Sequence, residues 1–395
     1  MRQDALAPLA IPANNVSPVL APVAVAVMRL MLTDFRGYAK ARLAVEPGPV
    51  VLYGANGAGK TNLLEALSFL APGRGLRRAK LSEIDRRDQT GAWALAAAVA
   101  TPAGEIEIGT GRDDVSDSGE RRHLRIDGSP AKSQQELAER FGLAWLTPQM
   151  DRLFIEGASS RRRFLDRLVT GFDPGHWARL NAYEKALRER ARLLRDGPQD
   201  PAWLAALEDA MAENGVALAA ARVEAVLRLD AACRSAKGPF PRAGLAVEGA
   251  VETSVQSMPA LAAEEEFRKI LRDGRRLDAE SGVTQNGPHR SDLLVQHLGT
   301  GVEAGSCSTG EQKALLISIT LAYAGLSAAR RGQAPMLLLD EITAHLDAER
   351  RSALFAAILE LKAQAWLAGT DAGLFEELRG NAQFFAISRA AIAPG

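Results

Sequence analysis

The amino-acid sequence predicts an α/β protein in which a sheet built from both ends of the chain flanks a mainly helical insert. A glycine-rich motif at residues 54–61 stands between an apolar run and a helical segment, as in phosphate-binding loops. A second apolar run, residues 336–339, ends in Asp340 and Glu341, which indicates a buried parallel strand. Between these motifs, residues 159–233 have helical periodicity and few β-branched runs.

Length and composition are those of a globular protein with more than one domain. The chain has 395 residues, of which 47% are hydrophobic. Lysine plus arginine equals aspartate plus glutamate at 48 each, so attraction to nucleic acid has to come from local patches. Two cysteines, Cys233 and Cys307, are too few for a secreted disulfide framework, which favours the cytoplasm. No apolar run approaches the roughly 20 residues of a membrane span, so we expect no membrane association.

The first third of the chain is expected to be mostly β-structure around one helix. Alternating apolar residues over 28–45 predict a strand, and the phosphate-loop unit with its helix at 62–70 follows directly. Short β-type runs at 93–100 and 105–109 are separated by glycine, aspartate and serine. They predict an antiparallel subdomain that a helix at 133–141 closes.

The insert is expected to hold two long helices joined by a turn at residues 196–201, where a glycine and two prolines interrupt the periodicity. The apolar spacing fits either a short antiparallel helical hairpin or two helices lying on a common core, and so few heptads do not separate the two. After residue 287 the α/β character returns, with further strands expected at 365–370 and 383–387.

These elements predict that the chain is divided into two lobes and an N-terminal extension. Lobe I combines residues 28–150 with residues 287–395 and carries the ligand motifs. Lobe II, residues 151–286, is the helical insert with the short hairpin. Residues 1–27, rich in alanine, proline and valine, are interpreted as a disordered extension or a mis-assigned translation start, with Met28 opening the folded chain.

The glycine-rich motif has the residue types that a nucleoside triphosphate requires. Its glycines let successive backbone N–H groups turn inward as an anion nest, and the helix that follows points its positive dipole end at the same place. Lys60 is expected to reach the β- and γ-phosphates, and Thr61 to ligate Mg²⁺. The expected nucleotide-binding residues of the motif are Gly54, Ala55, Asn56, Gly57, Ala58, Gly59, Lys60, Thr61 and Asn62. The alternative is a glycine-rich turn that binds nothing.

Two further segments are candidates for the same site. At the end of its strand, Asp340 could hold Mg²⁺ through water, and Glu341 could orient or deprotonate an attacking water. Hydrophobic strands that end in acidic residues are common, so this pattern gains meaning from the phosphate loop. Ser308 and Glu311 fit a helix capping box, and the same exposed helix start is also suited to a phosphate.

The order of the motifs resembles that of the ABC-type ATPases, in the branch that contains the SMC and RecF families. A phosphate loop, a glutamine segment at Gln149, Ser-Thr-Gly-Glu-Gln from Ser308, the acidic strand, and Ala-His-Leu-Asp ending at Asp347 follow one another. The resemblance implies an ABC-type ATPase head, a P-loop sheet with an antiparallel β subdomain, plus a helical lobe with a short antiparallel arm. In that superfamily the signature segment contacts nucleotide held by a second subunit, so ATP would join two heads.

The resemblance also implies single-residue roles. The expected catalytic residues are Glu341, Lys60 and Gln149. The expected Mg²⁺ ligands are Thr61, Gln149 and Asp340. Nucleotide contacts outside the loop are expected from Ser308, Gly310, Asp340 and Asp347.

Within the branch, the sequence is most similar to the RecF family, over nearly all of residues 28–387. The matching segments are residues 32–38, the arginine-rich 157–166 and, most specifically, 287–293 with the string Gly-Pro-His-Arg-Ser-Asp-Leu. The N-terminal extension has no counterpart in the family.

One position departs from the superfamily pattern. The strand after the acidic pair is followed by Gly369-Thr-Asp where a switch histidine is usual, which makes slow hydrolysis plausible. His345 is expected to line the dimer interface rather than to replace that histidine.

Two basic segments, residues 73–87 and the larger 159–195, are candidates for contact with DNA. The residues singled out in them and in the 287–293 string are Arg74, Arg77, Arg78, Arg161, Arg162, Arg163, His289 and Arg290. Almost no aromatic residues are interspersed, so phosphate contacts to duplex or a junction are expected rather than base stacking. The alternatives are a solvated helix face and, for the last two residues, a structural turn.

The RecF resemblance implies an ATP-dependent DNA-binding protein of recombination, replication and the SOS response. ATP and Mg²⁺ would drive homodimerisation, the dimer would clamp duplex DNA at gaps or stalled forks, and weak DNA-dependent hydrolysis would release it. Recombination mediators of the RecR and RecO type would be partners in recombinase loading. Two other functions stay open: a transporter-type ATPase subunit, disfavoured by the long insert and the arginines, and an SMC-like structural scaffold.

Overall fold

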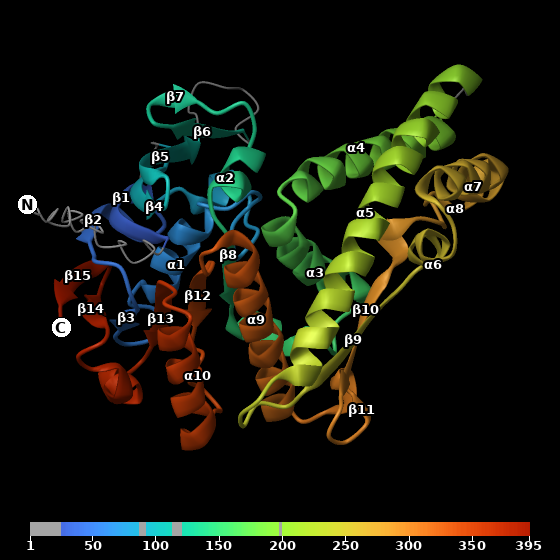
Figure 1. The fold of residues 1–395 in the computed structure, drawn as a ribbon. Helices are drawn as coiled ribbons and strands as arrows, with labels where there is room; N and C mark the ends of the chain where they lie inside the picture. The colour runs from blue at the N-terminus through green and yellow to red at the C-terminus, as the bar shows by residue number, and fades with distance from the viewer. Residues whose placement is uncertain (1–24, 87–91, 113–120, 197–199) are drawn as a thin grey trace, which may run out of the picture.

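The computed structural model describes residues 25–86, 92–112, 121–196 and 200–395, which form two lobes packed side by side (Figure 1). The predicted extension falls mainly outside the described residues. The first strand, β1, begins at Ala26, two residues before Met28, and pairs Ala26 with Ala100 and Val27 with Val99. Both residues are fully buried, and the Val27 backbone exchanges hydrogen bonds of 2.8 and 2.9 Å with the buried Gln364 side chain.

The first sheet is antiparallel, as predicted for the β subdomain, and has the strand order β2-β1-β4-β5-β6-β7. Its strands are β1 (Ala26–Phe35), β2 (Tyr38–Ala44), β4 (Ala94–Thr101), β5 (Gly104–Arg112), β6 (Arg122–Ile126) and β7 (Ser129–Pro130). The helix expected to close the subdomain is α2 (Gln135–Arg140).

The single strand predicted over residues 28–45 is wrong, because the chain turns back after Phe35. Phe35 pairs with Tyr38, so β1 and β2 form a hairpin with a two-residue turn. Arg36 takes a left-handed φ of 54° in that turn, and its guanidinium donates two hydrogen bonds, of 2.9 and 2.7 Å, to the Glu65 carboxylate. Alternation of apolar residues continues through a tight turn, so periodicity alone did not reveal it.

The second sheet holds the ligand motifs and mixes strands from both ends of the chain in the order β15-β14-β3-β13-β12-β8. Its strands are β3 (Val50–Tyr53), β8 (Leu143–Leu146), β12 (Met336–Asp340), β13 (Ala365–Gly369), β14 (Gln383–Ser388) and β15 (Ala391–Pro394). All but β15 run parallel. The strands predicted at 336–339, 365–370 and 383–387 are confirmed, since helices α1 (Lys60–Ser68), α9 (Thr309–Arg331) and α10 (Ala348–Glu360) bury apolar faces against them.

Lobe II contains three long helices where two were predicted. They are α3 (Ala158–Phe172), α4 (Gly175–Asp196) and α5 (Pro201–Ser235), followed by α6 (Ala250–Ser257), α7 (Ala260–Asp273) and α8 (Arg275–Ser281). Asp173-Pro-Gly175 separates the first two, because proline cannot continue the hydrogen-bond ladder and Asp173 accepts a bond from the Gly175 amide at 3.0 Å. The predicted hairpin is present as α4 and α5, which project as an arm in Figure 1.

Lobe II also contains a small sheet that the sequence did not predict, in the order β11-β10-β9. It consists of β9 (Ala243–Glu248), β10 (Asp292–His297) and β11 (Val302–Glu303). Because β10 comes after residue 287, this sheet takes a strand from the segment assigned to lobe I.

Helix α9 connects the two lobes through the main core. It packs against α5, α3 and β8, and among the described helices it alone is long and apolar enough to cross a membrane. Two thirds (67%) of that apolar window is buried inside the fold, as in the core helix of a globular domain. The apolarity of α9 is therefore explained by packing.

Candidate active site

The predicted ligand motifs meet at one edge of the parallel sheet. Strand β3 leads into the glycine-rich loop, β12 ends at Asp340, and β8 leads into a 3₁₀ helix, η2 (Pro148–Arg152), that carries Gln149. Strand β13 lies between β3 and β12 and pairs Gly369 with Tyr53 and Ala368 with Asp340. Because all four strands are parallel, their carboxyl ends share this edge.

The loop adopts the backbone that an anion nest requires. Gly54, Gly57 and Gly59 all have positive φ, of 149°, 78° and 119°. A Cβ on Gly54 would stand 2.2 Å from a backbone oxygen, so only glycine fits there. Tyr38 donates to the Gly59 carbonyl at 3.2 Å, and burial raises the pKa of Tyr38, which keeps the hydroxyl a donor.

Lys60 lies folded over the loop. Its Nζ donates to the Gly54 carbonyl at 2.6 Å and to the Ala55 carbonyl at 3.0 Å, and the residue is 4% exposed. Burial lowers the pKa of Lys60, and the carboxylates of Glu341 and Asp340 oppose that change. A triphosphate would offer this ammonium stronger acceptors than the two carbonyls.

The residues expected to hold Mg²⁺ are partly assembled. Thr61 donates to the Asp340 carboxylate, with its Oγ1 2.9 and 3.1 Å from the two oxygens. Burial raises the pKa of Asp340, an effect that a hard cation at these oxygens would reverse. Gln149 is exposed on η2. In the described ranges no group of three or more His, Cys, Asp or Glu side chains forms a metal cage, so a cation here would depend on water and phosphate oxygens.

Glu341 adopts an unusual backbone conformation directly after the strand. Its φ is 48°, in the left-handed region that costs a non-glycine residue about 1–2 kcal/mol. Its amide donates to the Ala368 carbonyl at 3.0 Å, which ties the turn to β13. The side chain is half-buried and makes no hydrogen bond with the described residues, so the carboxylate is free to accept one from a water.

The signature residues lie on exposed helix starts. Ser308 caps α9, where its Oγ accepts from the Glu311 amide at 3.3 Å and its own amide donates to the Glu311 carboxylate at 2.9 Å. The predicted capping box is thereby confirmed. Asp347 caps α10 by accepting from the Arg350 amide at 2.8 Å. A Cβ on Gly310 would meet nothing within 4 Å, which leaves room for a partner.

The basic candidates differ in how strongly the fold engages their side chains. Arg161 makes a bidentate ion pair with Asp292 at 2.7 and 2.6 Å, and Arg162 donates to the Ser291 carbonyl at 2.5 Å. Arg77 bonds Asn62 and Glu65, both at 3.0 Å. These three guanidinium groups hold the fold together.

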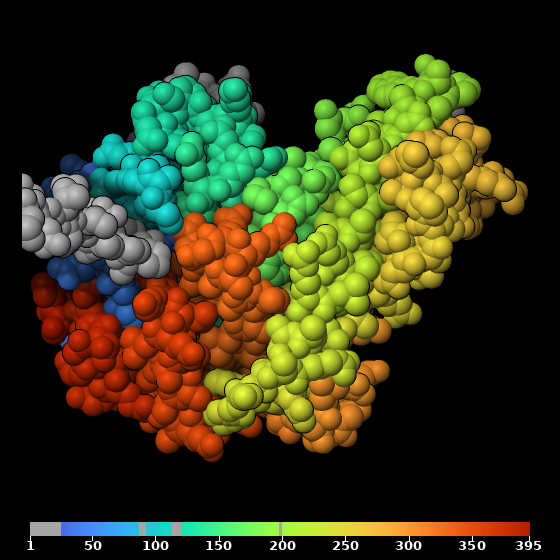
Figure 2. Space-filling view, viewed as in Figure 1, coloured from blue at the N-terminus to red at the C-terminus, as the bar shows by residue number. Residues whose placement is uncertain are grey.

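Arg74, Arg78 and Arg163 are exposed, and Arg163 donates one hydrogen bond, of 2.7 Å, to the Ser160 hydroxyl. Partial burial lowers the pKa of Arg78, and the charges of Arg163 and Arg74 act in the same direction, whereas Glu184 opposes them. The loop that carries Arg74 and Arg78 packs on lobe II, since a Cβ on Gly73 would stand 3.1 Å from the Trp177 ring. Half-buried Arg122 fixes the loop base by donating to the Ala71 and Gly73 carbonyls, both at 3.1 Å. In the space-filling view the surface is hollowed beside α2, between lobe I and the arm (Figure 2).

The string 287–293 lies inside lobe II at a buried crossing of helices. We call this crossing the lobe II junction and define it by Asp166, Tyr183, Arg222, Glu252 and residues 288–291. Arg222 donates to both Asp166 oxygens at 2.8 and 3.0 Å, to Glu252 at 3.3 Å and to the Pro288 carbonyl at 2.6 Å. Burial alone would raise the pKa of Asp166, but Arg222 and His176 hold it below its usual range.

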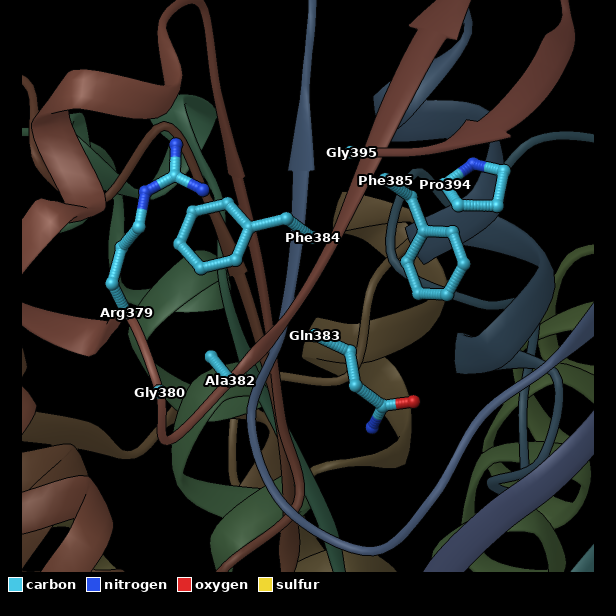
Figure 3. A pocket seen from close by; sticks show the side chains of 8 residues that line it. All are labelled: Arg379, Gly380, Ala382, Gln383, Phe384, Phe385, Pro394 and Gly395. Atoms are coloured by element: carbon cyan, nitrogen blue, oxygen red, sulfur yellow. The ribbon is translucent and has the colours of Figure 1, made fainter.

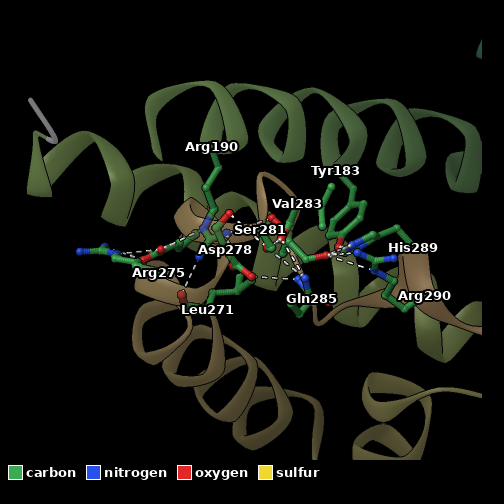
Figure 4. Close-up of polar contacts among 12 residues, drawn as sticks. Tyr183, Arg190, Leu271, Arg275, Asp278, Ser281, Val283, Gln285, His289 and Arg290 are labelled. Atoms are coloured by element: carbon green, nitrogen blue, oxygen red, sulfur yellow. Dashed lines mark hydrogen bonds and ion pairs between the residues drawn. The ribbon is translucent and has the colours of Figure 1, made fainter. Parts of the chain in front are cut away.

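His289 makes its contacts within the junction. The Tyr183 hydroxyl lies 2.7 Å from Nδ1 and the Thr284 carbonyl lies 2.9 Å from Nε2, so both ring nitrogens are occupied (Figure 4). Burial lowers the pKa of His289 to about 4. The structural turn weighed from the sequence therefore describes His289 better than a contact with DNA. Arg290 is exposed, although it also donates to the Thr284 carbonyl at 3.1 and 2.8 Å.

Sequence reasoning missed two residues at the nucleotide edge. Lys313 of α9 donates to the Glu341 carbonyl at 3.0 Å, and its Nζ lies 3.7 Å from an Asp151 oxygen. In the sequence, the available signal was a lone lysine directly before the apolar residues 314–317. The structure shows that Lys313 is only 4% exposed, which is rare for a lysine.

A separate hollow lies away from the phosphate loop. It measures about 370 Å³ and is lined by residues of β14 and the C-terminus (Figure 3). Gln383 in its wall pairs with Val50, at the start of β3, so the hollow lies at the sheet edge opposite the phosphate loop. Its one cation, Arg379, stacks on Phe384 at 4.6 Å and pairs with Glu376 at 3.0 Å. This hollow has no convergent polar groups, so size alone does not make it the site.

The parallel sheet, the phosphate loop, the acidic strand, the capped signature helix and the helical lobe together define an ABC-type ATPase head. A family model for the RecF/RecN/SMC N terminal domain matches residues 26–390. A solved structure of an Smc head domain from Pyrococcus furiosus overlaps 93% of the chain with a TM-score of 0.52 and 15% identity.

The similarity to RecF proteins is much greater. DNA replication and repair protein RecF of Mesorhizobium japonicum is 50% identical over 375 residues, covering 94% of this chain and 99% of that protein. RecF of Brucella suis is 51% identical over 93% of this chain and 96% of its own. A structure of the recombination mediator protein RecF-ATPrS in the RecFOR pathway has a TM-score of 0.81 at 22% identity, covering 94% and 99%. The chain belongs to the RecF family, and the transporter alternative is not supported.

Proposed function

We propose that this protein is an ATP-dependent DNA-binding protein of recombinational repair that acts in the cytoplasm. The observation that carries the proposal is the 50% identity, over 94% of the chain, to a relative named for DNA replication and repair. The convergence of Lys60, Thr61, Asp340 and Glu341 at one sheet edge supports ATP as the ligand.

The residues of the sheet edge suggest how ATP is bound and hydrolysed. Lys60 exchanges its two carbonyl partners for the β- and γ-phosphates, which the loop amides also hold. Mg²⁺, held by Thr61, Asp340 and Gln149, would neutralise phosphate charge. Glu341 orients and deprotonates the attacking water, so ATP and water give ADP and phosphate. Without a switch histidine after Gly369, we expect this reaction to be slow and to be stimulated by DNA.

The exposed signature residues support a role for a second subunit. Ser308, Gly310 and Asp347 lie on the starts of α9 and α10, and their helix dipoles suit an anion from a facing molecule. ATP bound by one subunit would be covered by the signature segment of the other. The resulting homodimer would clamp duplex DNA at gaps or stalled forks and support recombinase loading with RecR- and RecO-type mediators.

Exposed cations of the two lobes suggest where DNA binds. Arg74 and Arg78 come from lobe I and Arg163 from lobe II, and their side chains are exposed. A phosphate backbone lying across them would relieve their mutual repulsion and release counterions. Arg290 is a weaker candidate on the same chain.

Binding to gapped and intact duplex tests the proposal directly. We expect ATP with Mg²⁺ to increase affinity for gapped duplex in gel shifts, and affinity to fall steeply with salt. Sedimentation of the Glu341→Gln variant, which should bind ATP without hydrolysing it, is expected to show a dimer only with ATP. Equal sedimentation with and without ATP would exclude ATP-driven dimerisation. An SMC-like scaffold would dimerise with ATP but show no salt-dependent DNA binding.

A further inference from the structure

Lys313 is a buried cation near the start of the mostly apolar helix α9. It is 4% exposed and lies five residues after Ser308 on α9, next to the buried residues Ala314 and Leu315. An ammonium loses much of its hydration when it is buried, so a lysine here requires specific partners. Burial lowers the pKa of Lys313, and carboxylates at the nucleotide edge counteract that change.

The partners of Lys313 belong to two other ligand segments of the same chain. Its Nζ donates to the carbonyl of Glu341 at 3.0 Å, directly after β12. The same Nζ lies 3.7 Å from the carboxylate of Asp151, two residues after Gln149 on η2. Lys313 thereby joins the signature helix, the glutamine segment and the acidic strand at one point.

The bond to Glu341 bears on the geometry of the reaction. Glu341 has the left-handed φ of 48°, a conformation that persists only where its surroundings hold it. Its amide is held by the Ala368 carbonyl, and its own carbonyl accepts from Lys313 at 3.0 Å and from the Ala344 amide at 3.2 Å. These bonds fix the peptide planes on either side of the Cα, and so fix the direction in which the carboxylate leaves the backbone.

The contact between Lys313 and Asp151 has room to lengthen. A void of about 10 Å³ lies between η2, α9 and β12, lined by Asp151, Lys313 and Asp340 among others. Such a space is at the lower limit for one water molecule. Asp151 is partly exposed, with 30% of its side chain accessible, so the pair can lengthen without burying an unpaired charge.

We propose that Lys313 is a positioning residue that couples the signature segment to Glu341 of its own subunit. The inference rests on the proposed function, in which Ser308 and Gly310 contact nucleotide on the second subunit. Five residues of helix span about 7.5 Å, so nucleotide that draws Ser308 toward the partner also moves Lys313. Lys313 then shifts the Glu341 carbonyl. Nucleotide at one site of the dimer thereby sets the catalytic geometry at the other, and hydrolysis is cooperative.

The Lys313→Met variant tests the coupling, because methionine fills similar space without charge or donor. Binding of a fluorescent ATP analogue, ATP-driven dimerisation by sedimentation, and steady-state hydrolysis against ATP concentration are measured with gapped DNA present. We expect analogue affinity within about 3-fold of wild type and an intact dimer, but kcat lowered about 10- to 100-fold. The Hill coefficient should fall from above 1 in wild type to 1.

Matched variants separate coupling from a general loss of structure. Lys313→Arg keeps charge and donors and is expected to restore part of kcat and of the cooperativity. Lys237→Met removes an exposed lysine and should change nothing. Asp151→Asn weakens the other end of the contact at a partly exposed position and should lower the Hill coefficient even if Lys313→Met does not fold.

The possible outcomes are distinguishable. A Lys313→Met enzyme with kcat and Hill coefficient of wild type would overturn the coupling, as would an unchanged Hill coefficient in Asp151→Asn. A wild-type Hill coefficient of 1 would also overturn it. Failure of the wild type to bind ATP or to dimerise would instead refute the proposed function on which the coupling rests.

Discussion

The nucleotide edge of lobe I and the junction of lobe II are both rich in charged residues, but their charges are satisfied differently. At the nucleotide edge, Lys60 bonds only backbone carbonyls and the Glu341 carboxylate makes no hydrogen bond with the described residues. In the junction, Arg222 makes four hydrogen bonds to Asp166, Glu252 and the Pro288 carbonyl. The first region leaves strong groups for a ligand, whereas the second uses them within the chain.

This difference explains why the glycine-rich motif at residues 54–61 suits a ligand, whereas the equally specific string at 287–293 serves the fold. Buried charges need partners, and where the chain supplies all of them no ligand is required. Where a rigid loop or strand end exposes charges without partners, a ligand or water completes them. The 287–293 string is therefore better explained by holding the arm to the head than by contacting DNA.

We expect Glu341→Gln to lower the rate of ATP hydrolysis without affecting folding, and this is the largest effect expected from a single substitution. The variant should lower the ATP hydrolysis rate about 10²- to 10⁴-fold, because the amide cannot accept the proton of the attacking water. Analogue affinity and melting temperature should match wild type. Glu349→Gln, an exposed position on α10, is the control. A melting temperature lowered as much as the rate would mean that Glu341 is structural.

The opposite result is expected for Arg222→Met in the junction. Asp166 and Glu252 would stay buried with too few donors, so the free energy of unfolding should fall by about 3–5 kcal/mol. Urea unfolding measures the loss, and ATP analogue binding should persist below the transition. Arg228→Met on the same helix removes only an exposed ion pair with Glu224 and should cost about 0.3–0.5 kcal/mol. An equal loss of unfolding free energy in the two variants would contradict the stabilising role of Arg222 in the junction.

The stability of the junction should depend on pH through His289. Burial holds its folded pKa near 4, below the roughly 6.5 of an unfolded histidine, so the unfolded state binds more protons in this range. The stabilisation is complete above about pH 6.5 and is lost as pH falls toward 4. The total change should be about 2–3 kcal/mol after allowance for partial exposure. His289→Gln should flatten the dependence of unfolding free energy on pH between pH 6.5 and 4.5, measured by urea unfolding at each pH.

The smallest effects are expected from the three exposed arginines without a carboxylate partner among the described residues. Arg74→Ala, Arg78→Ala and Arg163→Ala should each weaken DNA binding several-fold and reduce the slope of log K against log salt by about 0.9. Stability should change by less than about 0.5 kcal/mol. Arg161→Ala breaks the pair with Asp292 and should instead lower stability while the salt slope stays constant. A reduced salt slope in Arg161→Ala alone would mean that DNA contacts the paired arginine rather than the three exposed ones.

Local patterns predicted the nucleotide edge well because its parts are short and autonomous. The glycine loop, the strand ending at Asp340 and the capping box at Ser308 each follow from neighbouring residues, and the structure has all three elements. The hairpin turn at Arg36, the break at Pro174 and the sheet of β9 and β10 were missed. Long-range pairing and side-chain contacts decide these features, and periodicity carries no information about either.

The sequence by itself determined the phosphate loop, the acidic strand and their order, because backbone geometry at glycine and a buried apolar strand depend on adjacent residues. Only the tertiary structure decided which charges are free. Arg161 and Arg163 are two residues apart in one arginine run, yet the helix directs one to Asp292 of β10 and leaves the other exposed. Lys313 likewise gains its meaning from Asp151 and Glu341, which are distant in sequence. Whether a charged side chain binds the fold or a ligand depends on what the fold brings to it.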